Sequence, residues 1–294
     1  MKKPALLIFA VLLSLSFKTS GQGLLSKLDS IQPDKNETEV VKGTFTNVRL
    51  INGYTCETAA KNELYFSISH RFGSPNQGIY DFFGLDQGTI RLGLEYGLSD
   101  RIDLGIGRSN FEKLYDGFFK FKLFQQSSGI KNFPFTITWL EGMSVKTQKY
   151  IEKNADYPFS SRLYYVHEVF IARKFNDNFS LQLAPVIVHR NMVKTADDQN
   201  TIFALGAGVN YKIARRLRAV CEYYYQFRKK TSVPFDNSLS LGVDIETGGG
   251  HVFQLFLTNS SGMTEKSFIP ETNGSWMKGN IIFGFNIIRL FSLK

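Results

Sequence analysis

The sequence lacks the features that mark helical membrane proteins, disulfide-rich secreted proteins and metal proteins. Its 294 residues include only two cysteines, Cys56 and Cys221, and neither lies in a C-x-x-C or C-x-x-C-H pattern, so a haem or zinc site has no support. A disulfide between them and two separate thiols both remain open. No apolar run after Phe17 approaches the about 20 residues that a membrane helix needs. A membrane-spanning mature chain must therefore form a closed β-barrel, because only closure satisfies every strand hydrogen bond in lipid.

The chain also lacks a block of basic residues, although its formal net charge is +9. A nucleic-acid surface gathers its basic residues on one face, and here they are spread through the chain. We therefore expect no nucleic acid among the partners. A weakly cationic barrel that meets anionic lipid headgroups is a more natural interpretation of this charge.

Residues 1–21 have the pattern of a cleaved signal peptide. Lys2 and Lys3 precede an apolar core that ends at Phe17, and small residues follow it up to Gly21. Loss of this segment removes three of the lysines. Export fits a protein of the outer membrane.

The stretch from Thr89 to Gly107 sets the pattern for the rest of the chain. Its apolar residues share one parity, and its glycines and charges share the other. Successive side chains of a strand point to opposite faces, and the break at Leu98–Arg101 is short enough for a hairpin. The stretch therefore predicts two antiparallel strands, each with one apolar face.

This unit recurs through residues 61–294 and predicts an all-β, antiparallel, up-and-down transmembrane barrel of about 12 strands. The connections alternate in length. Those near Ser99, Ser128, Asn176, Arg215 and Gly249 are short, and those from Gly73, Ser109, Gly142, Asn191, Lys229 and Ser260 are mostly longer. Short periplasmic turns and long outer loops are the arrangement of outer-membrane barrels.

A soluble β-sandwich or lipocalin-like barrel would also alternate, with its apolar face turned inward. Two features favour the membrane barrel: a polar face that carries glycines and charges of both signs, and aromatics that recur near strand ends. On that polar face we predict the residues that line the lumen: Arg91, Glu95, Arg101, Asp103, Lys120, Lys122, Lys212, Arg218, Glu222, Asp244 and Glu246.

Residues 22–60 show no clear alternation, apart from a short extended piece and a turn between Val40 and Tyr54. In a barrel this segment begins in the periplasm. It either stays there or folds back into the lumen as a plug, and the sequence leaves both open.

The sequence offers no catalytic constellation. Some barrel enzymes place His and Ser two residues apart on a lipid-facing strand. His189 lacks that serine, and the residue at the same parity before His70 is Ile68. We predict no enzyme, no cofactor and no metal site.

Several motifs resemble an uncharacterised outer-membrane β-barrel family of the Bacteroidota, a domain of unknown function. They are Arg49–Gly53, Ser69–Gly73, Phe83–Asp86, Ile90–Gly97, Gly107–Ser109 and Tyr115–Gly117. The resemblance implies a β-barrel of the cell envelope and brings no catalytic residues.

Three functions remain in order of preference. The first is a porin-like channel for small solutes, motivated by the mixed charges and glycines of the lumen. The second is a non-conducting barrel that docks an envelope partner. The third is a lipid-modifying enzyme, which would depend on His70 or His189. Each implies outer-membrane lipid and the outer-membrane insertion machinery as partners.

Overall fold

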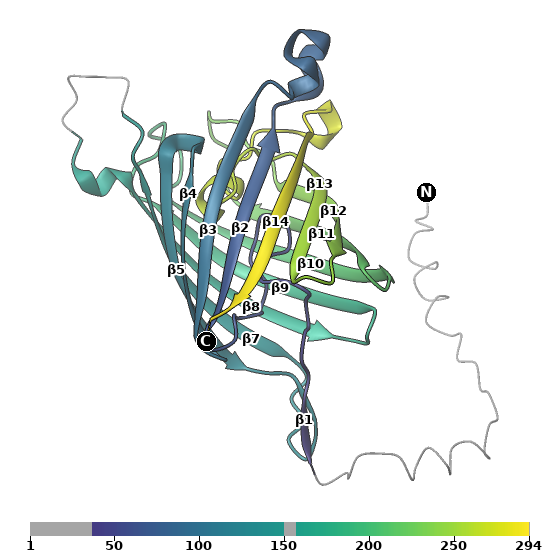
Figure 1. The fold of residues 1–294 in the computed structure, drawn as a ribbon. Coiled ribbons are helices and arrows are strands. Elements are labelled where there is room, and N and C mark those ends of the chain that lie inside the picture. The colour runs from purple at the N-terminus through teal and green to yellow at the C-terminus, as the bar shows by residue number, and fades with distance from the viewer. Residues whose placement is uncertain (1–36, 150–156, 294) are drawn as a thin grey trace, which may run out of the picture.

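The computed structural model describes residues 37–149 and 157–293 and confirms the predicted fold class. Twelve antiparallel strands close into one barrel, in the order β10-β11-β12-β13-β14-β2-β3-β4-β5-β7-β8-β9 (Figure 1). The strands are β2 (Glu63–Phe72), β3 (Gly88–Ser99), β4 (Ile102–Ser109), β5 (Leu114–Phe124), β7 (Thr136–Lys146), β8 (Leu163–Lys174), β9 (Phe179–Arg190), β10 (Thr201–Ala214), β11 (Leu217–Phe227), β12 (Ser238–Glu246), β13 (His251–Thr258) and β14 (Ile282–Ser292).

The alternation of the strands places apolar side chains outside the barrel and polar ones inside. On β3, Leu92 is 47% exposed while its neighbour Arg91 is 1% exposed. A soluble barrel would have the opposite arrangement, because water would drive the leucines inward. The outward apolar face is suited to lipid.

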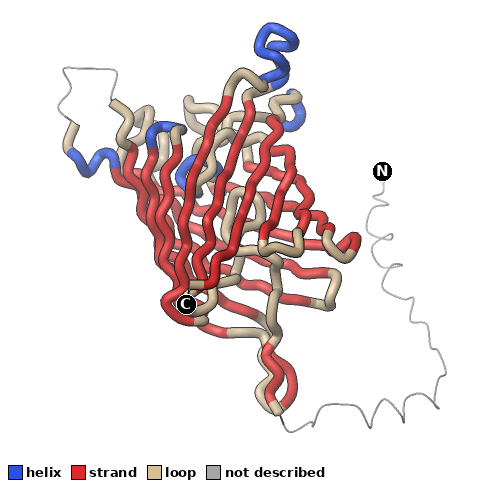
Figure 2. Tube along the Cα trace, viewed as in Figure 1, coloured by secondary structure: helices blue, strands red, loops and turns tan. Residues whose placement is uncertain are grey.

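The two ends of the barrel differ. Short turns close one end, and a two-stranded sheet of β1 (Thr38–Val40) and β6 (Ser127–Gly129) hangs below it (Figures 1 and 2). The opposite end carries the longer connections, with the 3₁₀ segments η1 (Pro75–Gly84), η2 (Phe111–Lys113), η3 (Phe159–Arg162) and η4 (Trp276–Lys278) and the short helix α3 (Glu265–Phe268).

Several boundaries differ from those expected. Strand β7 runs on to Lys146 through a stretch predicted to be loop, because Ser144 and Val145 pair with Tyr164 and Leu163 of β8. The connection from Ser260 does not extend away from the barrel as an outer loop, because its residues 262–269 are almost wholly buried inside it. No helix among the described residues has the length and hydropathy to cross a bilayer. The predicted signal peptide and residues 22–36 lie outside the described residues.

Candidate functional site

The segment from Thr44 to Ala59, here called the plug, occupies the lumen of the barrel. Leu50, Ile51, Asn52 and Cys56 are at most 2% exposed. A bridge between Arg49 and Tyr54 closes the tight turn that the sequence suggested in this region. Residues 44–59 of the same chain therefore lie inside the barrel.

The carboxylate of Glu222 on β11 binds the tip of the plug. The backbone N–H groups of Ile51, Asn52 and Gly53 donate to it, with N–O distances of 3.2, 2.8 and 3.1 Å. Three backbone donors converging on one carboxylate satisfy hydrogen bonds that a buried polar group needs. This contact fixes the depth to which the plug enters the barrel.

Polar side chains of the neighbouring strands complete the binding of the tip. The side chain of Asn286 on β14 donates to the carbonyl of Ile51 at 2.9 Å, and Gln254 on β13 donates to the carbonyl of Leu50. Arg71 on β2 donates to the side-chain oxygen of Asn52 at 2.8 Å. The wall thus supplies partners that buried backbone groups of an irregular segment need.

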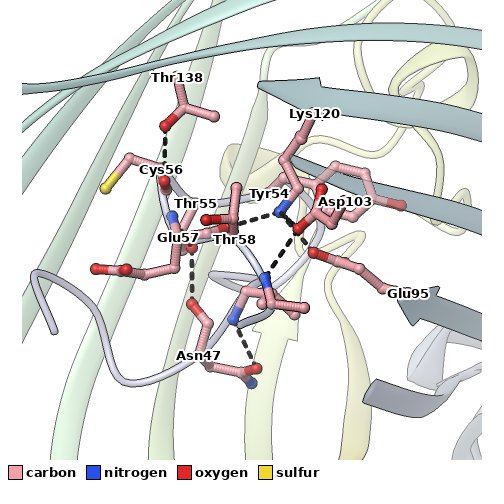
Figure 3. A network of polar contacts seen from close by, with 12 residues as sticks. Asn47, Tyr54, Thr55, Cys56, Glu57, Thr58, Glu95, Asp103, Lys120 and Thr138 are labelled. Atoms are coloured by element: carbon pink, nitrogen blue, oxygen red, sulfur yellow. Dashed lines mark hydrogen bonds and ion pairs between the residues drawn. The ribbon is translucent and has the colours of Figure 1, made fainter. Parts of the chain in front are cut away.

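The second half of the plug binds the opposite wall (Figure 3). Lys120 on β5 lies 2.6 Å from Glu95 and 3.5 Å from Asp103, and its ammonium also donates to the carbonyl of Glu57 at 2.7 Å. Asp103 in turn accepts from the backbone N–H of Ala59 at 3.0 Å. Lys120 and Asp103 of the wall therefore hold the plug through its backbone, and Glu95 pairs with Lys120.

Part of the lumen wall is apolar. Leu140, Val166, Phe170, Val186 and Val188, on β7, β8 and β9, are at most 4% exposed and form a cluster with the plug. The plug side of that cluster is Phe45, Leu50, Ile51, Tyr54 and Cys56. Here the plug packs as a protein core does.

The connection between β13 and β14 enters the lumen from the other end. Its residues 262–269, including α3, are here called the inner loop, and Phe268 is completely buried. The ring of Tyr224 on β11 packs edge-on against Phe268 with centroids 5.0 Å apart, and its hydroxyl donates to Glu168 at 3.3 Å. The inner loop and the plug therefore meet at Tyr224.

Side chains of alternating charge connect the inner loop to the end of the barrel that carries the longer connections. Lys266 pairs with Glu112 of η2 and lies 2.8 Å from Glu271, and Arg190 lies 3.2 Å from Asp198. Burial works to raise the pKa of Glu112, but the ammonium groups of Lys266 and Lys146 outweigh it and hold the pKa below its usual range. A pocket between the plug, the inner loop and the wall, beside Tyr54 and Glu265, has a volume of about 20 Å³, room for about one water.

The structure brings most of the predicted lumen residues onto the inner wall. Arg91, Glu95, Asp103, Lys120, Lys122, Glu222 and Asp244 are all buried there. Lys212, Arg218 and Glu246 are half-buried at the end with the short turns. Arg101 is not on the wall: it lies exposed in the turn between β3 and β4, where the strand alternation that placed it no longer applies.

Sequence reasoning missed several interior residues. Arg71, Asp116, Gln182, Gln254 and Asn286 all bind within the lumen. Arg71 shares its parity with Ser67 and Ser69, so the alternation of β2 carried the signal. The contacts that the plug makes with the wall have no such periodic signal in the sequence.

The histidines and cysteines form no metal centre in the described part of the chain. His70 stacks on Phe285 on the outer face, with centroids 5.1 Å apart, and His189 lies 2.8 Å from the Thr201 hydroxyl. Both cysteines are free thiols, Cys56 in the plug and Cys221 on β11. The described residues contain no group of three or more His, Cys, Asp or Glu that would hold a metal ion.

Comparison with known proteins gives one family. Residues 45–291 match the family described as "Membrane bound beta barrel domain (DUF5777)", and no curated protein matches the chain. Among solved structures, the NanC porin is 8% identical with a TM-score of 0.48, over 79% of this chain and 99% of that chain. The KdgM porin is 10% identical with a TM-score of 0.45 over the same shares. LpxR from Salmonella typhimurium is 9% identical with a TM-score of 0.38, over 78% of this chain and 100% of that chain.

Proposed function

Because this chain belongs to the membrane-bound β-barrel family DUF5777, we propose that it is an outer-membrane channel for small solutes that the plug holds closed at rest. The observation that carries the proposal is the chemistry of the plug's contacts: charged and amide side chains of the wall bind it, largely through its backbone. Water replaces such partners readily when a segment leaves.

The polar part of the wall would form the conduit. With the plug displaced, Glu95, Asp103, Lys120, Lys122 and Glu222 would face an aqueous space from β3, β4, β5 and β11. A barrel of about 12 strands lies between those filled by side chains and the open porins of 16 or more, so its pore would be narrow and its solutes small. Outer-membrane lipid and the insertion machinery are the partners that this role implies.

Planar-bilayer recordings test the proposal. We expect the refolded full-length protein to be silent, and the protein without residues 22–60 to show discrete conductance steps. A heat-dependent gel shift must first establish that each form is a folded barrel. Silence of a folded, plug-free barrel under all voltages would overturn the channel.

The apolar part of the wall favours a second function. If the plug left, the apolar cluster that includes Val166, Phe170, Val186 and Val188 would lose the packing that the plug supplies beside the inner loop. The cost of this loss scales with the apolar area exposed to water. A permanently filled barrel that docks an envelope partner avoids this cost. In that case both forms would be silent, and cross-linking would recover a partner only while residues 22–60 are present.

A further inference from the structure

The outer wall of the barrel carries an acid–base pair halfway along its strands. Glu141 on β7 and His167 on β8 are register partners, and the His167 Nδ1 lies 2.5 Å from the Glu141 carboxylate. Both side chains share the outward parity of their strands with Trp139 and Tyr165, and they are 33% and 50% exposed. Glu141 is the one carboxylate on the outward parity of the barrel strands described.

The depth of the pair sets it apart from the other ionisable residues of the outer wall. Glu141 has five residues of β7 on either side of it. The other outward-facing Asp, Glu, Lys, Arg and His side chains of the described strands all lie within three residues of a strand end, where headgroups and water reach them: His70, Arg108, Arg173, His189, His251 and Arg289. A charged or strongly polar group facing lipid near mid-membrane is unfavourable, and such residues mark functional sites by default.

We propose that the β7–β8 wall is the interface of a two-fold dimer, in which a second copy of this chain covers Glu141 and His167. Two barrels inserted in the same direction are related by an axis along the membrane normal. Neighbouring strands lie about 4.8 Å apart. An axis that passes between the two side chains therefore sets each Glu141 opposite the His167 of the second copy.

The surroundings of the pair fit a protein partner better than lipid. Met143, 49% exposed, follows Glu141 on the same face, and Trp139 precedes it and contacts Phe119 edge-on at 6.5 Å. Tyr165 lies beside His167 at the same parity. Aromatic residues and methionine are enriched at protein interfaces. An acid and a base at one site are also self-complementary, which a two-fold contact requires. A different partner would need a matching pair of its own.

Cysteine cross-linking in outer membranes tests the dimer on the full-length chain. In a Cys221→Ser background, Met143→Cys should give a disulfide-linked species of twice the monomer mass on mild oxidation. The matched control is Leu255→Cys on β13, which is exposed on the outer wall at 41%, against 49% for Met143, and lies six strands away around the closed barrel. It should stay monomeric.

Charge variants decide whether the pair holds the interface. Adding Glu141→Leu and His167→Leu should lower the cross-linked fraction roughly tenfold, while the heat-dependent gel shift of the barrel persists. The swap Glu141→His with His167→Glu keeps an acid opposite a base and should restore the dimer, whereas Glu141→His alone should not. A monomer in both cysteine variants, equal linking of both, or linking to a protein of another mass would overturn the proposal. None of these readouts depends on conduction.

Discussion

The hydroxyl of Tyr224 lies directly against Gly53, so that a Cβ added at position 53 would overlap it. Tyr224 cannot easily yield, because its ring packs on Phe268 of the inner loop and its hydroxyl donates to Glu168. One residue of the wall thus joins the tip of the plug to the loop that enters from the opposite end. If the barrel opens, we expect this contact to couple access to the lumen from its two ends.

The first prediction concerns that contact. Gly53→Ala should weaken the seating of the plug by about 1–3 kcal/mol, the usual cost of overpacking a filled interior. Cys56 lies in the plug and is completely buried, so its labelling by a water-soluble maleimide, in a Cys221→Ser background, reports the opening. Gly117→Ala would place its Cβ at ordinary contact distance, 3.6 Å from the carbonyl oxygen of Gly105, and should not change labelling. Gly53→Ala with Tyr224→Phe should label more slowly than Gly53→Ala alone.

The second prediction concerns the carboxylate that binds the plug tip. Glu222→Gln keeps the shape of the side chain but removes the charge that three backbone N–H groups share. Hydrogen bonds to charged groups contribute about 1.5–3 kcal/mol each, so Cys56 should become accessible and brief conductance events should appear. Glu246→Gln is a suitable comparison, because the Glu246 side chain pairs with Arg218 on the same wall and not with the plug. Equal labelling of the two variants would contradict the role given to Glu222.

The third prediction is a loosening of the inner loop in acid. The pKa of Glu112 is held below its usual range, against an ordinary value of about 4.3 for a glutamate. A carboxyl group whose pKa is lower in the folded state than in the unfolded state stabilises the fold at pH values above its unfolded pKa. This stabilisation is lost as the pH falls through the folded-state pKa. Hydrogen exchange of residues 262–269, corrected for its intrinsic pH dependence, should therefore rise below about pH 4. Glu112→Gln should exchange faster at neutral pH and lose this acid dependence; a wild-type-like profile would rule out the Glu112–Lys266 contact as the fastening.

The fourth prediction concerns ion selectivity once the plug is displaced. The Lys122 ammonium lies 3.5 Å from Glu57 of the plug, so plug removal frees it to face the conduit. In the plug-free protein, Lys122→Glu should make the pore more selective for cations, so that the reversal potential in a salt gradient moves toward the equilibrium potential of the cation. Lys122→Gln should move the reversal potential about half as far. Lys120 is a poor choice for this test, because Glu95 and Asp103 both bind it and a reversal there leaves three carboxylates together. An unchanged reversal potential would remove Lys122 from the conduit.

The sequence alone determined the barrel and the facing of its strands. Alternation with a period of two is a local property, so Arg91 and Leu92 could be assigned to opposite faces without knowledge of any partner strand. The same reasoning placed Glu222 and Lys120 inside. It failed for Arg101, because a turn breaks the period.

Only the tertiary structure decided what fills the barrel. Glu222 and Ile51 bind each other although they are 171 positions apart in the sequence, and the inner loop comes from another connection again. Nothing local in residues 44–59 marks them as a plug, since an irregular segment finds partners for its backbone groups only when the wall has closed around it. The period of the strands fixes which side chains face inward; the closure of the barrel fixes what those side chains bind.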